Sequence, residues 1–147
     1  MAGLSARPDP HLLRRYLEVC AINTAGVVSQ RTLNETAGIA KATGEAYDAL
    51  LGSLFLIDTL PAWWTNRLKR LTKRAKRYIV DPSIALAALR VDLPGLMRDG
   101  YLLGRMVETL VVAHLRAELP RRRGTPREAG NFRFLRDGQA VVPEVRS

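Results

Sequence analysis

The sequence predicts a mainly α-helical fold with a small β-hairpin, and three observations lead to this prediction. Apolar residues recur at helical spacing in three stretches between residues 10 and 54. Helix-capping residues and glycine separate these stretches. A basic run then follows, with seven lysines and arginines from Arg67 to Arg77. Three helices followed by a basic hairpin are the arrangement of a winged helix-turn-helix.

The first predicted helix starts at Asp9-Pro10, because an aspartate before a proline is a typical helix start. Its apolar residues recur at spacings of three and four up to Ile22. The polar and small residues 23–26 interrupt the pattern and end the helix.

A helix-turn-helix is predicted next. Ser29 is placed to cap a short second helix that Gly38 ends. Thr43 is placed to cap a third helix, whose apolar positions continue to Leu54. Glycine permits the tight turn between the two helices, and the aliphatic Ile39 is expected to fill their junction.

The basic run predicts the wing. In a strand, alternate side chains share a face, so the cations of residues 67–74 would lie on both faces of the hairpin. The return strand is predicted from Lys76 to Val80, before Asp81-Pro82. The tryptophans at 63 and 64 come just before the run, and indoles can stack on bases or pack along lysine stems. A solvated charged hairpin with no ligand is the competing interpretation.

The second half of the chain alternates helices and breaks. A helix is expected over residues 83–89, and Asp92, Pro94 and Gly95 predict a break. A longer, largely apolar helix is expected over residues 102–119, ended by Pro120. A mobile loop should follow over 121–130, and strands are possible over 132–135 and 140–145. Two units are therefore expected, residues 10–81 and 82–147, with the tail after residue 120 mobile.

Composition narrows the function classes. A chain of 147 residues with 47% apolar content can bury one modest core. The formal charge of +9 favours an anionic partner, and nucleic acid before membrane. The single Cys20 lies in an apolar run, so no intrachain disulfide can form and a reduced, buried thiol is expected. No leader or membrane span is indicated, and a cytoplasmic location is predicted.

Candidate nucleic-acid-binding residues lie on the helix-turn-helix and on the predicted wing. Glu45 and Asp48, near the start of the third helix, would oppose phosphates, although a carboxylate can accept a hydrogen bond from cytosine. The candidates are Gln30, Arg31, Lys41, Thr43, Trp64, Asn66, Arg67, Lys69, Arg70, Lys73, Arg74 and Lys76.

The sequence also resembles a known family, the region of unknown function that follows the ATPase domain in prokaryotic AAA-type ATP-binding proteins. The resemblance covers about residues 12–119. The residues that carry it are Leu60-Pro61, Trp64, Asn66, Lys69-Arg70, Lys76, Tyr78 and Asp81, and then Gly104 and Glu108 in the later helix. It implies a winged helix followed by an α/β part similar to restriction endonucleases.

That second part is incomplete in this sequence. The family carries a helix glutamate with strand carboxylates and a lysine that could hold a divalent ion such as Mg²⁺. The only matching set here is Glu108, Asp137, Glu144 and Arg146, in which an arginine replaces the lysine. An ion pair with Arg105, one turn away, is the competing interpretation of Glu108.

Other chemistry has little support. The motif Gly-x-x-x-x-Gly-Lys-Ser/Thr does not occur, so ATPase activity of this chain is not expected. His11 and His114 have no second ligand at metal-binding spacing, and no cofactor is predicted. The sequence thus favours nonspecific binding of nucleic acid, with DNA as the expected ligand. A module that docks on an ATPase or another protein, or a non-functional truncated remnant, remains the alternative.

Overall fold

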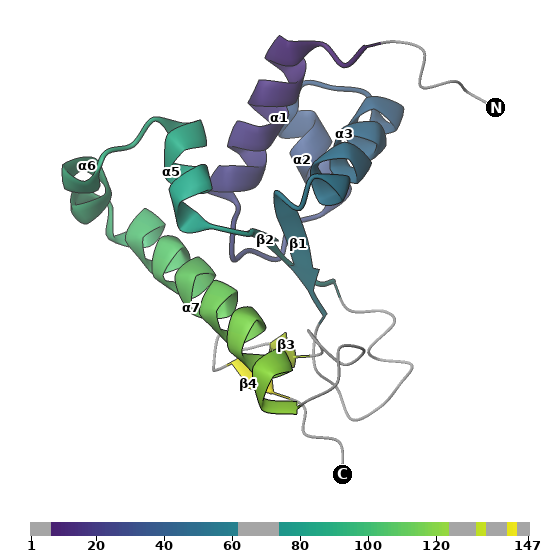
Figure 1. Ribbon diagram of the computed structural model, residues 1–147. Helices are drawn as coiled ribbons and strands as arrows, with labels where there is room; N and C mark the ends of the chain where they lie inside the picture. Colours follow the sequence, from purple (N-terminus) through teal and green to yellow (C-terminus); the bar gives the residue numbers. More distant parts are fainter. Residues whose placement is uncertain (1–6, 62–73, 124–131, 135–140, 144–147) are drawn as a thin grey trace.

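The computed structural model describes residues 7–61, 74–123, 132–134 and 141–143 (Figure 1). These parts of the chain contain six helices and two antiparallel sheets of two strands each, which confirms a mainly helical fold with a small hairpin. The elements are α1 (Pro10–Ile22), α2 (Gln30–Ala37), α3 (Lys41–Ser53), β1 (Ile57–Leu60), β2 (Lys76–Ile79), α5 (Pro82–Leu89), α6 (Leu93–Arg98), α7 (Gly100–Arg123), β3 (Phe132–Phe134) and β4 (Val141–Pro143).

The first two helices begin and end as their capping residues predict. The Asp9 side chain accepts hydrogen bonds from the first backbone amides of α1, and the Ser29 side chain accepts one from the Thr32 amide of α2. Gly38 ends α2 in the left-handed conformation, with φ 68°.

The start predicted for α3 is wrong. Ala40, in an extended conformation, precedes the helix, and the Gly44 amide already donates to the Ala40 carbonyl at 3.0 Å. The tight turn at Gly38 brings the chain into helical geometry as soon as it ends, so Thr43 lies inside the first turn instead of capping it.

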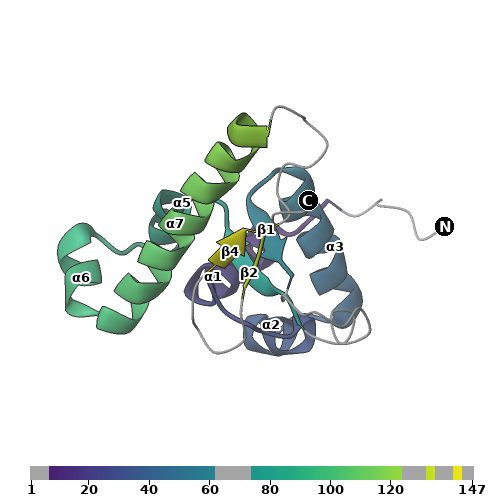
Figure 2. The ribbon, with the colours of Figure 1, turned by 90° about the horizontal axis from the view of Figure 1, so that it is seen from below.

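The hydrophobic core is built around α1. Tyr16 and Ala21 of this helix are fully buried, and they pack in one cluster with residues from α2, α3, β2, α5, α6 and α7. Viewed from below, α2 and α3 lie on one side of the hairpin, and α5, α6 and α7 lie on the other (Figure 2). The core is therefore continuous from the helix-turn-helix to the later helices.

The sequence predicts only one of the two strands of the hairpin. The return strand β2 was predicted, whereas its partner β1 was not, because Ile57–Leu60 continues the apolar run of α3 and has no turn residue before it. The strands pair from Ile57 with Ile79 to Leu60 with Lys76. Gly26, in the connection between α1 and α2, forms an isolated antiparallel bridge with Arg77 on the other edge of β2.

Two predicted breaks in the second half are wrong. Residues 92–95 form the start of α6, because Asp92 accepts a hydrogen bond from the Gly95 amide at 2.8 Å and Pro94 stands in the first turn, where its missing N–H costs nothing. Pro120 does not end α7, which continues to Arg123. A proline removes one backbone hydrogen bond of a helix, but its fixed φ is itself compatible with helical geometry.

The strands expected near the carboxyl-terminal end are present and pair with each other. Phe132 is opposite Pro143, and Phe134 is opposite Val141. The loop predicted over 121–130 is helical as far as Arg123, and its remainder lies outside the described residues.

Two glycines of α3 give a matched test of how closely α2 and α3 pack. A Cβ on Gly44 would lie 1.9 Å from Oδ1 of Asn34, whereas a Cβ on Gly52 would meet nothing within 4 Å. We expect Gly44→Ala to destabilise the protein by about 1–3 kcal/mol through overpacking. Gly52→Ala should instead stabilise it by about 0.5–1 kcal/mol, because alanine is the better helix former. Urea denaturation of both variants measures the difference, and equal effects would contradict the close helix contact.

Candidate nucleic-acid interface

The turn between α2 and α3 fixes the orientation of the helix-turn-helix. The Gly38 amide donates to the Glu35 carbonyl at 3.2 Å, and the Ile39 amide donates to the Asn34 carbonyl at 3.0 Å. These bonds use the last carbonyl groups of α2. Ile39 is half-buried and packs against the core, in agreement with the predicted role of this residue at the junction.

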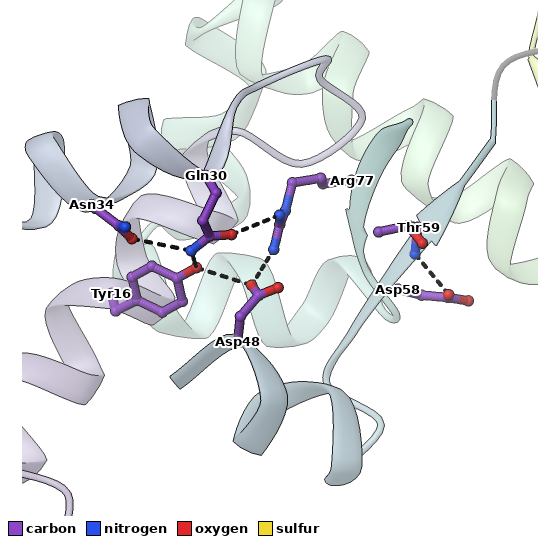
Figure 3. Close-up of polar contacts among 7 residues, drawn as sticks. All are labelled: Tyr16, Gln30, Asn34, Asp48, Asp58, Thr59 and Arg77. Atoms are coloured by element: carbon purple, nitrogen blue, oxygen red, sulfur yellow. Dashed lines mark hydrogen bonds and ion pairs between the residues drawn. The ribbon is translucent and has the colours of Figure 1, made fainter. Parts of the chain in front are cut away.

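A polar network attaches the helix-turn-helix to the hairpin (Figure 3). Asp48 of α3 accepts hydrogen bonds from the Tyr16 hydroxyl, at 2.9 Å, and from the Arg77 guanidinium. Arg77 also donates to the side-chain oxygen of Gln30 at 3.0 Å. The Gln30 amide group donates in turn to Tyr16 at 2.7 Å and to Asn34 at 3.0 Å. Five residues from α1, α2, α3 and β2 are thus held in one arrangement.

This network changes how two residues of the predicted interface are interpreted. Asp48 was expected to face a ligand, and it lies instead against Arg77, where its charge is neutralised. Gln30 was expected to contact a nucleic-acid backbone, and the structure gives both ends of its amide internal partners. Sequence reasoning missed Tyr16, Asn34 and Arg77, because nothing in the pattern distinguishes Arg77 from the other cations of the basic run.

The remaining described candidates on the helix-turn-helix lie at its surface. Arg31 and Lys41 are strongly exposed, and each forms an ion pair one helical turn away, with Glu35 at 2.7 Å and Glu45 at 3.7 Å. Thr43 is half-buried. An open groove of about 500 Å³ runs between α2 and α3, lined by Gln30, Arg31, Asn34, Glu35, Ile39, Lys41 and Glu45. Its charges balance, so it has no strong preference for anions.

The structure describes the residues on either side of the predicted wing, up to residue 61 and from residue 74 onward. Leu60 pairs with Lys76, so the chain between them leaves and re-enters the hairpin at the same end. Arg74 is exposed. Six further candidates lie outside the described residues, namely Trp64, Asn66, Arg67, Lys69, Arg70 and Lys73.

The last two cations of the basic run are used inside the protein. Arg77 belongs to the network around Asp48, and Nζ of Lys76 lies 2.6 Å from the Glu108 carboxylate of α7. The Tyr78 hydroxyl donates to the same carboxylate at 2.8 Å. The expected pairing of Glu108 with Arg105 is wrong, because β2 brings two donors to Glu108 while Arg105 donates to the Thr24 carbonyl at 2.8 Å.

Two further contacts hold α7 against the hairpin. Arg116 forms an ion pair with Asp58 at 2.6 Å and donates to the Thr59 carbonyl at 2.9 Å. The buried Thr109 hydroxyl lies 2.9 Å from the Thr24 hydroxyl, which also accepts a hydrogen bond from the Ile79 amide. The side of α7 that faces the hairpin is therefore partly polar.

The proposed nuclease residues cannot be brought together within the described part of the chain. Glu108 is occupied by Lys76 and Tyr78, and Asp137, Glu144 and Arg146 lie outside the described residues. In the part that the structure describes, no group of three or more His, Cys, Asp or Glu side chains could hold a metal ion. The described helices include none long and apolar enough to cross a membrane.

Burial raises the pKa of two tyrosines in these networks and of the buried Cys20. Desolvation raises the pKa of Tyr16 and of Tyr78 well above the usual range, and for Tyr78 the hydrogen bond to Glu108 adds to the shift. Burial also raises the pKa of the Cys20 thiol to about 12. All three groups therefore hold their protons more tightly in the folded protein than in the unfolded chain.

The chain belongs to a family defined by a domain of unknown function, DUF8612, whose model matches residues 1–94. The matched range contains α1 to α3, the hairpin and α5, and it ends at the start of α6. No curated protein and no solved structure matches the chain.

The raised pKa values predict a loss of stability in alkali. Below the pKa of the unfolded thiol and phenols, the folded and unfolded states bind the same protons at these sites. Above about pH 9 the unfolded chain releases them first, so the free energy of unfolding should fall as pH rises. Urea denaturation between pH 7 and pH 10.5 measures this, and Tyr16→Phe and Tyr78→Phe should each reduce the slope. A pH-independent free energy of unfolding would contradict the burial of these groups.

Two arginines of the basic run provide a second test. Arg77→Ala leaves the Asp48 carboxylate and the Gln30 amide without their cation, and we expect a loss of about 1–3 kcal/mol of stability. Arg74→Ala, three residues earlier and exposed, should change stability by less than about 0.5 kcal/mol. Thermal and urea unfolding of the two variants compares them, and similar losses would show that the network is not specifically stabilising.

Proposed function

We propose that this protein binds nucleic acid nonspecifically, as a winged helix that uses α2, α3 and the segment between β1 and β2. The order of elements supports a winged helix, because three helices precede an antiparallel hairpin. The isolated bridge between Gly26 and Arg77 also places the connection between the first two helices alongside β2. Residues 10–81 would then form the binding unit.

One observation carries the proposal, and it concerns the segment from residue 61 to residue 75. Its sequence contains five cations and no aspartate or glutamate, and both of its ends are held by the pairing of Leu60 with Lys76. The two cations outside it, Lys76 and Arg77, have internal carboxylate partners. Two of the seven cations of the run therefore form ion pairs within the folded protein. We assign the other five to contacts with a phosphate backbone, which closely spaced lysine and arginine side chains bind well.

The helix-turn-helix supports the same proposal in a secondary way. Asp48 no longer opposes a nearby phosphate, because Arg77 neutralises it. The first turn of α3 receives no side-chain cap, so its backbone amides can donate to a phosphate oxygen. The balanced ion pairs of Arg31 and Lys41 give no base-specific pattern, which agrees with nonspecific binding.

The resemblance to the region after AAA-type ATPase domains leads to a proposal about context. Nucleotide hydrolysis, where it accompanies binding, would come from another polypeptide, because this sequence has no phosphate-binding loop. The nuclease alternative is not favoured, since Glu108 already accepts hydrogen bonds from Lys76 and Tyr78. Docking on another protein is favoured by one observation, the exposed apolar side chains of Tyr101, Val107, Leu110 and Val111 on α7.

A charge-reversal experiment tests the proposal. We expect the protein to bind mixed-sequence duplex DNA with an affinity that falls steeply with salt, by about 0.9 logarithmic units per phosphate contact. The double variant Lys69→Glu with Arg70→Glu should lower affinity by at least about tenfold at low salt and reduce the salt slope by about two contacts. Fluorescence anisotropy at four salt concentrations measures both quantities.

The matched control has the same change of net charge elsewhere. Arg90, which directly follows α5, and Arg98, the last residue of α6, are exposed. Both helices lie on the other side of the hairpin from α2 and α3 (Figure 2). Arg90→Glu with Arg98→Glu should reduce affinity far less than the wing variant. Equal losses would show that only the total charge matters, and no binding at low salt would remove the proposal.

A further inference from the structure

Glu108 of α7 holds a lysine at the end of the hairpin next to the basic run. Nζ of Lys76 lies 2.6 Å from Oε1 of Glu108, and the Tyr78 hydroxyl donates to the same oxygen at 2.8 Å. Lys76 forms the last pair of the hairpin, with Leu60, and it directly follows residues 61–75, called here the basic segment. Glu108 therefore binds the first cation after the segment that the proposed function assigns to a phosphate backbone.

The two cations of β2 are held in different ways. The planar guanidinium of Arg77 contacts both Asp48 and Gln30, which belong to the helix-turn-helix. Lys76 contacts α7 through an ammonium group on a flexible four-carbon stem, and the Glu108 side chain that it meets is 35% exposed. A phosphate can therefore approach this ion pair from solvent, and Lys76 can change partners by rotating its stem, with little change in the backbone of β2.

The two halves of α7 are attached to the protein differently. Leu102 and Met106, in the first half, belong to the buried core cluster. From Glu108 onward, the contacts with the hairpin include ion pairs of Glu108 and Arg116 with its two strands. An open cavity of about 190 Å³ lies between this part of α7 and the hairpin, and Val112 is part of its lining. Space is therefore available for the second half of α7 to shift on the hairpin without disturbing Leu102 and Met106.

The family match separates the two partners of the ion pair. The matched range, residues 1–94, contains Lys76 and Tyr78, whereas α7 begins after it, at Gly100. The basic segment and the lysine beside it thus belong to the matched domain, and the carboxylate that holds the lysine does not. Glu108 therefore acts on the proposed binding unit, residues 10–81, from outside that unit.

We propose that Glu108 is an autoinhibitory group, which withholds Lys76 from nucleic acid until a phosphate takes its place. The inference rests on the proposed function. A phosphate that follows the basic segment accepts the hydrogen bond of the Lys76 ammonium group, while Glu108 keeps the hydrogen bond from Tyr78. Until then, the Glu108 carboxylate also repels a phosphate near this end of the hairpin. The contact therefore lowers affinity, and its release adds one phosphate contact.

A charge-neutral variant of Glu108 tests the inference. Glutamine keeps the shape of glutamate and still accepts hydrogen bonds from Lys76 and Tyr78, but it carries no charge. We expect Glu108→Gln to raise the affinity for mixed-sequence duplex DNA by about threefold to tenfold at low salt. The slope of log affinity against log salt should steepen by about 0.9, because Lys76 becomes a further phosphate contact. Fluorescence anisotropy at four salt concentrations measures both quantities.

Glu18 supplies the matched control. It forms an ion pair with Arg14 at 3.5 Å within α1, and its side chain is 39% exposed, close to the 35% of Glu108. Glu18→Gln makes the same change of net charge, so it should leave the salt slope unchanged and raise affinity far less than Glu108→Gln. Equal effects of the two variants would overturn the inference, because only the total charge would then matter.

A Lys76→Gln background tests whether this lysine carries the gain. In that background Glu108→Gln should change neither the affinity nor the salt slope, and an undiminished gain would overturn the inference. Thermal unfolding establishes that each variant is folded. DNA binding by the native protein with no effect of Glu108→Gln would overturn this inference alone, whereas the absence of binding by the native protein and every variant would remove the proposed function as well.

Hydrogen exchange of the native protein gives a second measurement that needs no variant. Release of Lys76 frees the second half of α7, so saturating DNA should speed amide exchange over residues 108–116 relative to residues 100–106. Exchange over residues 108–116 that is unchanged or slower in the complex would contradict the release of this contact.

Discussion

The alternation of side chains along β2 is the constraint on which the rest of the structure depends. Successive residues of a strand point to opposite faces. Lys76 and Tyr78 therefore meet Glu108 of α7, while Arg77 meets Asp48 of α3 on the other face. A strand of four residues thereby fixes a helix on each of its two sides. A shift of the register by one residue would turn Arg77 away from Asp48 and turn Lys76 and Tyr78 away from Glu108, so both sets of contacts would break.

Local signals in the sequence predicted the first two helices well, and long-range contacts account for most of the errors. Ser29 and Gly38 act within one turn of the chain, so their roles follow from their neighbours. β1 exists only because β2 pairs with it, and its apolar residues fit a continued helix equally well. Glu108 was assigned a partner on its own helix, although the nearest donors come from a strand about 30 residues earlier in the chain. Alternation holds for Lys76, Arg77 and Tyr78 of β2, but which face of a strand meets the protein depends on packing that the sequence does not display.

The charge of the chain divides into two parts with different roles. Lys76, Arg77 and Arg116 are at least three-quarters buried, and they neutralise carboxylates that tie helices to the hairpin. These ion pairs position elements, and their removal would expose unpaired charges to a poorly solvated environment. The five cations of residues 61–75 have no acidic residue within that segment, and they are the ones that the proposed function assigns to a phosphate backbone. Net charge alone would not have separated the two groups.

The pairing of Leu60 with Lys76 has a consequence for how this fold can vary. Leu60 is fully buried, and Lys76 is held by Glu108, so both ends of the connecting segment are anchored to the folded part of the chain. The entropic cost of closing a flexible loop rises only by about 0.6 kcal/mol for each doubling of its length. A change in the length or sequence of the segment between these two residues should therefore have little effect on folding. Selection can change the basic segment while the helices and the hairpin stay the same.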